Sequence, residues 1–205
     1  MKRPSKRVVP KKVVDEMDGK KETPDVLQIK ITLDGSQPPI WRTVLCKSDM
    51  NLEKFHGVIQ DAMGWHDSHL HLFEVVDQSV GPRDLEYSDT TDEREVTLED
   101  VRFGNATFWY DYDFGDSWGH HIYIEKDVPC DPKVSYPVCI AGERKCPPED
   151  CGGIWGYQSM LDGLADGTIS DYMREWLEEY TMGEPWNAEE FDLEKVNSRL
   201  RERRF

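Results

Sequence analysis

The feature that most constrains the fold is a stretch of alternating aromatic and polar residues from Ala106 to Glu125. Within it, every second side chain from Phe108 to Phe114 is aromatic, which is the two-residue period of a β-strand. Residues 115–117, Gly-Asp-Ser, are typical of a short turn, and a second alternating run follows them. The stretch therefore predicts a central antiparallel β-hairpin.

The alternation also predicts how the two strands of this hairpin pair. If Phe114 faces Trp118 across the turn, one face is aromatic or apolar apart from a single imidazole. The expected pairs are Tyr112–His120, Tyr110–Ile122 and Phe108–Ile124 on that face, and Asp111–His121 and Trp109–Tyr123 on the other. A slip of one residue would exchange the two faces, so the hydrophobic pattern should specify the register.

The charge of the chain is strongly uneven. Its 205 residues carry a formal net charge of −16, but residues 1–21 alone carry +5 and the remainder −21. Such an acidic body would repel nucleic-acid phosphates and anionic membrane surfaces, so direct nucleic-acid binding by it is not expected. Alternatively, the negative charge serves only to keep the protein soluble.

The sequence predicts a cytoplasmic protein. No apolar run approaches the length of a transmembrane helix, so no membrane contact is expected, and the basic start lacks the apolar core of a secretory signal. Five cysteines, an odd number, do not resemble a secreted disulfide framework. Residues 1–24 are expected to form a disordered basic leader, and residues 25–205 a single α+β domain.

The residues before the central hairpin indicate another hairpin, a helix and a third strand. Residues 27–33 and 40–46 alternate as strands on either side of a Gly/Pro-rich turn. Asn51 is placed to cap a helix that Gly64 ends, and residues 70–76 form the next strand. This order is typical of the start of a β-grasp (ubiquitin-like) arrangement.

The residues after these elements are less regular until the C-terminal part. Residues 78–95 are expected to be an exposed connection, and residues 127–156 to be rich in loops. Gly167 should end one amphipathic helix, while Ser170 and Asp192 should cap two more. The helices are predicted at residues 157–164, 172–180 and 193–203. The expected fold class is α+β, with a mixed sheet on which the C-terminal helices pack.

Two histidines near the third strand are candidate metal ligands. His69 and His71 are two residues apart, so on a strand they would share one face and could reach one ion. A pair is an incomplete ligand set, and the alternative for each is a position at the surface or the edge of the core.

Cysteines of the loop-rich segment form a second candidate set, for zinc. Cys139, Cys146 and Cys151 could join His120 as four ligands if the loops brought them together. Their gaps of six and four residues do not match a Cys-x2-Cys knuckle. The alternative is that they are buried free thiols.

Carboxylates of the central hairpin and of a later loop form a third set. Asp111, Asp113, Asp116, Glu149 and Asp150 could hold a divalent ion or act as acid and base. Asp111 and Asp113 would share a strand face. The alternative for Asp113 and Asp116 is turn formation through hydrogen bonds to nearby amides, and for Asp150 a tight turn.

Aromatic residues could wall a small-ligand pocket beside these carboxylates. Trp118 and Tyr157 are candidates, although both could equally belong to the core. The sequence motifs of serine hydrolases and of nucleotide-binding loops are not found. Ser117 and Ser159 do not lie in a G-x-S-x-G motif. The glycines of residues 152–156 do not follow a predicted strand, as those of a phosphate-binding loop would.

Six short sequence motifs occur in a fixed order along the chain. Each motif alone is weak, but together they are specific for one protein family. They are Pro39–Arg42; Gly64–Trp65 with Ser68–Leu70; Tyr110–Trp118 with His120; Tyr136–Pro137 with Cys139; Gly142–Glu143 and Cys146–Asp150 with Gly152, Gly153, Gly156 and Tyr157; and Phe191–Asp192 with Asn197 and Leu200. From about Leu27 to Leu200 the chain resembles the Ri-plasmid "open reading frame three"-like family, also labelled a transposon-passenger or TnpR-like family.

The resemblance implies an association with plasmids or mobile elements but no particular activity. Recombination is not supported, because a recombinase needs clustered arginines around a scissile phosphate. The matched blocks offer only Arg42 and Arg144 within an acidic body.

The leading hypothesis is a binding or accessory protein whose central hairpin, Cys-Pro-Pro-Glu-Asp loop and His69 strand end form one site. That site would take a small ligand or a metal ion, with zinc as the candidate cofactor. The candidate residues are His69, Asp111, Asp113, Asp116, Trp118, His120, Glu149, Asp150 and Tyr157. One alternative is a metal-dependent hydrolase of phosphoesters or similar small substrates, in which His120 or Glu149 handles the proton. Another is a structural protein that binds a protein partner.

Overall fold

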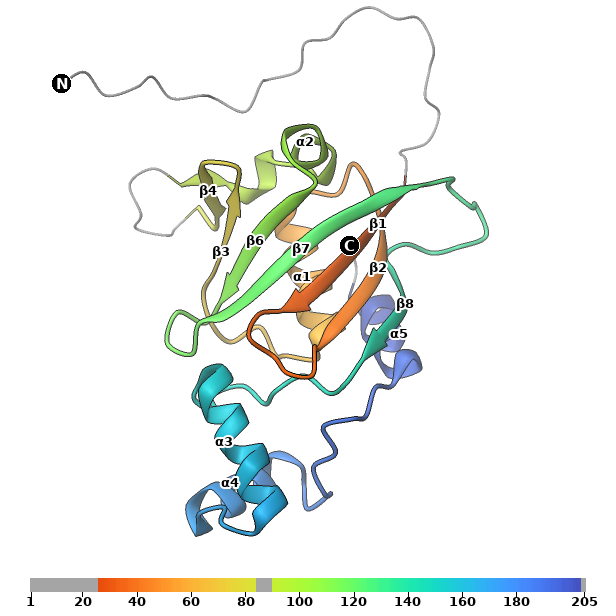
Figure 1. Ribbon diagram of the computed structural model, residues 1–205. Coiled ribbons are helices and arrows are strands. Elements are labelled where there is room, and N and C mark those ends of the chain that lie inside the picture. The colour runs from red at the N-terminus through yellow and green to blue at the C-terminus, as the bar shows by residue number, and fades with distance from the viewer. Residues whose placement is uncertain (1–25, 84–89, 204–205) are drawn as a thin grey trace, which may run out of the picture.

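The described residues, 26–83 and 90–203 of the computed structural model, form one eight-stranded sheet (Figure 1). Its strand order is β5-β4-β3-β6-β7-β1-β2-β8, and all neighbours are antiparallel except β4 and β5. The expected α+β class with a mixed sheet is confirmed. The predicted leader, residues 1–24, lies outside the described residues.

The described residues contain eight strands and six helices, one of which is a short 3-10 helix. The strands are β1 (Val26–Leu33), β2 (Trp41–Lys47), β3 (His71–Val75), β4 (Gln78–Gly81), β5 (Thr91–Asp92), β6 (Thr107–Tyr112), β7 (Trp118–Val128) and β8 (Val138–Glu143). The helices are α1 (Leu52–Met63), the short 3-10 helix η1 (Glu93–Glu95), α2 (Leu98–Gly104), α3 (Gly153–Asp166), α4 (Asp171–Tyr180) and α5 (Leu193–Glu202).

Helix α1 covers one face of the sheet and supplies much of the core (Figure 1). It begins where predicted, because the Asn51 side chain accepts a hydrogen bond from the Lys54 amide. It ends at Gly64, whose φ of 94° is in the left-handed region. Phe55 is fully buried against the aromatic rings of Phe73 and Phe108 on the sheet.

The central hairpin forms, but its predicted register is wrong by two residues. Tyr112 pairs with Trp118, and Tyr110 pairs with His120. A shift of two residues keeps the same faces, so the apolar face is still the buried one. The reason is the turn: β6 ends at Tyr112, and residues 113–117 form a longer loop than the three residues expected.

The C-terminal helices pack on the sheet only in part. Helix α5 lies beside β8 and α1, whereas α3 and α4 lie beyond the end of the sheet near the β6–β7 turn (Figure 1). The β-grasp arrangement is not confirmed either, because β6 and β7 lie between β3 and β1 in the sheet.

Two segments expected to be irregular contribute strands instead. Residues 78–95 hold β4, β5 and η1, and the side chain of Glu93 there is buried rather than exposed. Residues 138–143 form the edge strand β8. At this edge the Asn197 amide of α5 accepts from the Cys139 backbone N–H (2.9 Å) and donates to the Cys139 carbonyl (3.0 Å).

Candidate metal site

Three segments that are distant in the sequence meet at the β6–β7 turn. His69 lies just before β3, Asp113 begins the turn, and Asp150 lies in the loop before α3. One ligand atom from each of the three lies within 4.8 Å of the other two. His69 Nδ1 is 3.7 Å from Asp113 Oδ1, and His69 Nε2 is 3.1 Å from Asp150 Oδ1.

Left-handed backbone conformations occur at both aspartates whose carboxylates lie near His69. Asp113 and Asp150 have φ values of 56° and 60°, a left-handed conformation that aspartate tolerates better than most residues but that still costs energy. The Asp113 amide donates to the Leu70 carbonyl (2.9 Å), and Asp113 Oδ1 accepts from the Gly115 amide (3.0 Å). These hydrogen bonds hold the turn next to Leu70, and therefore close to His69.

Asp116 joins the turn to the loop before α3. Its carboxylate accepts a hydrogen bond from the Gly152 amide at 3.1 Å. A Cβ atom at Gly153 would lie 2.4 Å from the Asp116 carbonyl oxygen, so only glycine permits this approach. Asp116 therefore positions the loop that carries Asp150, and its carboxylate is not part of the cluster.

Glu149 holds the same loop against the segment before β3. Its buried carboxylate accepts a hydrogen bond from the Tyr112 hydroxyl (2.6 Å) and another from the His66 amide (3.0 Å), and it lies 2.7 Å from His66 Nδ1. Burial and this bond to Glu149 raise the pKa of Tyr112. Ser68 donates its amide to the same hydroxyl (2.9 Å), so Tyr112 connects both segments. The sequence offers no signal for this role of Tyr112.

Three other predicted site residues lie in the core or on α3. The Trp118 ring packs 5.8 Å from that of Trp65. His120 is 0% exposed, and burial lowers the pKa of its imidazole to about 4. Tyr157 is buried against Trp186, and burial raises its pKa to about 12. None of the three belongs to the cluster of His69, Asp113 and Asp150.

Asp111 and Asp113 do not share a strand face, because β6 ends between them at Tyr112. Asp111 lies on the face of the sheet opposite Tyr110 and Tyr112, where partial burial raises the pKa of its carboxyl. His69 and His71 likewise do not reach one ion: β3 begins only at His71, whose ring contacts the Glu93 carboxylate at 2.7 Å.

The cysteine set does not assemble. Among the residues that the structure describes, the group whose ligand atoms meet is His69, Asp113 and Asp150, without a cysteine. Cys139, Cys146 and Cys151 are buried free thiols. Burial raises the pKa of each thiol, to about 12 for Cys151.

A buried histidine network near α1 was missed by the sequence analysis. The rings of His56 and His71 stack at 3.5 Å between centroids with an angle of 7°. His56 Nε2 contacts Asp67 Oδ1 and His56 Nδ1 contacts the Tyr110 hydroxyl, both at 2.7 Å. Burial lowers the pKa of His56. Asp67 and Tyr110 lie 11 and 54 residues from His56 along the chain, separations that match no local spacing pattern.

The fold and the cluster define a class: an α+β protein with one open, largely antiparallel sheet and a histidine–aspartate cluster at the end of its central hairpin. The sequence model of the plasmid pRiA4b ORF-3-like protein family matches residues 25–195, and the chain belongs to this family. The resemblance seen in the sequence is thereby confirmed.

Two similar proteins have names that state no activity. The uncharacterized protein y4hQ of Sinorhizobium fredii (strain NBRC 101917 / NGR234) is 40% identical over 146 residues, which cover 69% of this chain and 74% of the relative. The crystal structure of MM3350, a protein of unknown function from Methanosarcina mazei Go1, is similar with a TM-score of 0.76 and 32% identity. That match covers 86% of this chain and 99% of the other. None of the helices in the described residues is long and apolar enough to cross a lipid bilayer.

Proposed function

We propose that this protein is a metal-binding accessory protein that holds one divalent cation between His69, Asp113 and Asp150. The observation that carries the proposal is the convergence of these three ligand atoms within 4.8 Å from three separate segments. Two carboxylates and a neutral imidazole would balance the charge of a divalent ion. The odd number of free cysteines supports a reducing, cytoplasmic setting for this role.

The donor set favours a transition metal. Imidazole nitrogen with carboxylate oxygen suits Zn²⁺, Mn²⁺ or Fe²⁺, whereas Mg²⁺ prefers oxygen ligands alone. Bonds of about 2.0–2.2 Å place donor atoms roughly 3–3.5 Å apart around an ion, so the cluster must contract slightly on binding. The Asp150 side chain, 65% exposed, is free to make that movement.

The proposal does not extend to hydrolysis. The hydrolase alternative gives the proton transfer to His120 or Glu149, and both groups are engaged elsewhere. Glu149 accepts hydrogen bonds from Tyr112 and His66, and His120 is 0% exposed. The geometry therefore supports binding rather than catalysis.

The test is the metal content of untagged protein purified without chelator and dialysed against Zn²⁺ or Mn²⁺. We expect close to one bound ion per chain, and we expect Asp113→Asn and Asp150→Asn to lower the affinity about 10- to 100-fold. Asp111→Asn is the matched control, since Asp111 lies on the same hairpin but on the opposite face. Cys146→Ser tests the cysteine alternative.

Retention of the metal by both cluster variants would overturn the proposal, as would folded wild-type protein that takes up no ion. Loss of the metal in Cys146→Ser alone would instead support zinc binding by the cysteines. Circular dichroism of each variant verifies that the fold is intact.

A further inference from the structure

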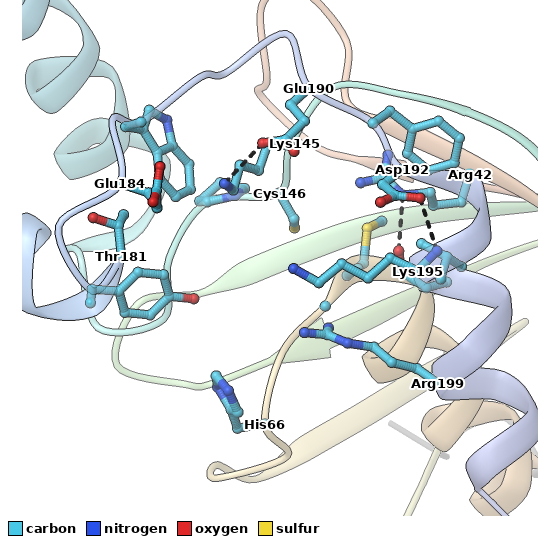
Figure 2. A pocket seen from close by; sticks show the side chains of 18 of the residues that line it. Arg42, His66, Lys145, Cys146, Thr181, Glu184, Glu190, Asp192, Lys195 and Arg199 are labelled. Atoms are coloured by element: carbon cyan, nitrogen blue, oxygen red, sulfur yellow. Dashed lines mark hydrogen bonds and ion pairs between the residues drawn. The ribbon is translucent and has the colours of Figure 1, made fainter.

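A pocket of about 610 Å³ lies between α5 and the chain that follows α4 (Figure 2). Its other walls are the C-terminal end of α1 and the loop at Cys146. This volume is typical of small-molecule sites. We propose that this pocket, called the α5 pocket below, binds a small organic anion with a carboxylate or phosphate group and an apolar body.

Two basic side chains carry the proposal. Lys195 and Arg199 are one helical turn apart on α5, and Figure 2 shows both extending from the helix into the pocket. Within residues 26–83 and 90–203, neither side chain has a hydrogen-bond or ion-pair partner. Like charges at this spacing repel each other, and a bound anion would remove that repulsion. Two basic groups that have no carboxylate partner among the described residues are unexpected in a protein with a net charge of −16.

Most of the acidic groups in the pocket wall are already engaged. Glu190 forms an ion pair with Lys145 (3.2 Å), and Asp192 caps α5 by accepting from the Lys195 amide. Glu184 is exposed and lies on the side of the pocket opposite α5 (Figure 2). The region between Lys195 and Arg199 is therefore the positively charged part of the pocket.

The remaining wall is suited to an apolar body. Met63, Pro147 and Trp186 contribute to the lining. Trp186 is held in place by Lys145, whose ammonium lies 4.7 Å from the centre of the indole ring. An anion whose charged group meets Arg199 would thus place its body against aliphatic and aromatic side chains.

Arg199 also has a structural role at the end of α1, which the experiment separates from ligand binding. A Cβ atom at Gly64 would lie 2.7 Å from an Arg199 nitrogen, so the guanidinium lies at the C-terminal end of α1. A positive charge there would stabilise that helix end through its dipole. In that case Arg199 would affect stability but not ligand binding.

The test is calorimetric titration of the full-length protein with phenyl phosphate, with phenylacetate and with the neutral 2-phenylethanol. We expect saturable binding of at least one anion, weaker binding at high salt, and no saturable binding of the alcohol. Arg199→Gln and Lys195→Gln should each weaken anion binding at least tenfold. Arg201→Gln is the matched control, because Arg201 lies on the same helix and pairs with Glu194 instead.

The two anions also distinguish a phosphate site from a carboxylate site. Absence of saturable binding of either anion at millimolar concentration would overturn the proposal. So would unchanged anion affinity in both Arg199→Gln and Lys195→Gln. The titrations are performed after removal of metal with EDTA, so their outcome is independent of the proposed cation at His69.

Discussion

His120 is a polar side chain that the fold holds in an apolar environment. Its ring lies 5.3 Å from that of Trp65 in an edge-on contact, and neither ring nitrogen makes a well-aligned hydrogen bond within the described part of the chain. Burial lowers its pKa from 6.5 to about 4. Folding therefore selects the neutral imidazole, because charging it would place an uncompensated charge in the core.

This pKa predicts a pH dependence of stability. Because the folded pKa lies below the unfolded value, the unfolded chain binds more protons between pH 6.5 and pH 4, and stability falls as the pH falls through that window. For His120 the loss is about 2 kcal/mol by pH 5, at 1.36 kcal/mol per pKa unit. His56, whose pKa is also lowered, contributes with the same sign.

Urea unfolding at pH 7, 6 and 5 measures this effect. The variant His120→Leu should be less dependent on pH than the wild type, whatever its absolute stability. The control is His121→Gln, at an exposed neighbouring position. An unchanged slope in His120→Leu would show that His120 does not carry the effect.

Residue identity alone was sufficient to select His69, Asp113 and Asp150 as candidates, because few side-chain types bind metal ions. It was not sufficient to separate them from Asp111 or Trp118. Which of these side chains meet depends on the left-handed conformations at Asp113 and Asp150. Those conformations are stabilised by contacts between segments that are distant in the sequence.

At the scale of the element, the central hairpin depends on a contact between Trp109 and Gly119. The Trp109 indole lies over the glycine on the sheet face, such that a Cβ atom at Gly119 would be 2.3 Å from the ring. The same indole meets the His121 ring edge-on at 4.4 Å between centroids. In the register predicted from the sequence, Trp109 would have faced Tyr123 and this contact would be absent.

The variant Gly119→Ala tests this contact. The added methyl group must displace the indole, so we expect a loss of about 1–3 kcal/mol in the free energy of unfolding. In a double-mutant cycle with Trp109→Leu the two effects should not be additive, because the smaller side chain removes the clash. Additive losses would mean that the indole does not restrict this position.

The elements that the sequence predicts well are those with local signals. Helix α1 begins after Asn51 and ends at Gly64 as expected, and Ser170 and Asp192 cap the helices predicted for them. Strand pairing and the positions of α3 and α4 could not be derived in the same way. They depend on contacts between residues far apart in the chain, such as the hydrogen bond from the Gly152 amide, at the start of α3, to the Asp116 carboxylate in the β6–β7 turn.

At the scale of the whole molecule, the buried guanidinium of Arg42 connects the sheet, α1 and the loop that carries the candidate site. It donates hydrogen bonds to four backbone carbonyls, those of Trp41, Ala62, Glu143 and Arg144, at 2.7–2.9 Å. The Phe191 ring packs against it, 4.6 Å from the guanidinium carbon. Arg42 thus has a structural role, and its charge faces carbonyl oxygens rather than a phosphate.

We expect Arg42→Lys to lower the free energy of unfolding by about 3 kcal/mol, because an ammonium cannot reach four acceptors and buried carbonyls would remain unsatisfied. The measurement is chemical denaturation, with Arg201→Lys as the control. Arg201 is exposed and forms an ion pair with Glu194 at 3.7 Å, so its replacement should change stability by less than about 0.5 kcal/mol. Equal effects of the two substitutions would contradict the structural role of Arg42.

The hydrogen bonds between Asn197 and Cys139 have a consequence for self-association. An exposed edge strand offers free N–H and C=O groups to which a strand of another molecule can add, and repetition of that step produces a fibril. On β8 the Asn197 amide occupies both groups of Cys139, as the backbone of a ninth strand would. One side chain thereby blocks polymerisation at this point of the edge. The opposite edge strand, β5, is only two residues long, so it offers little template for growth in the other direction.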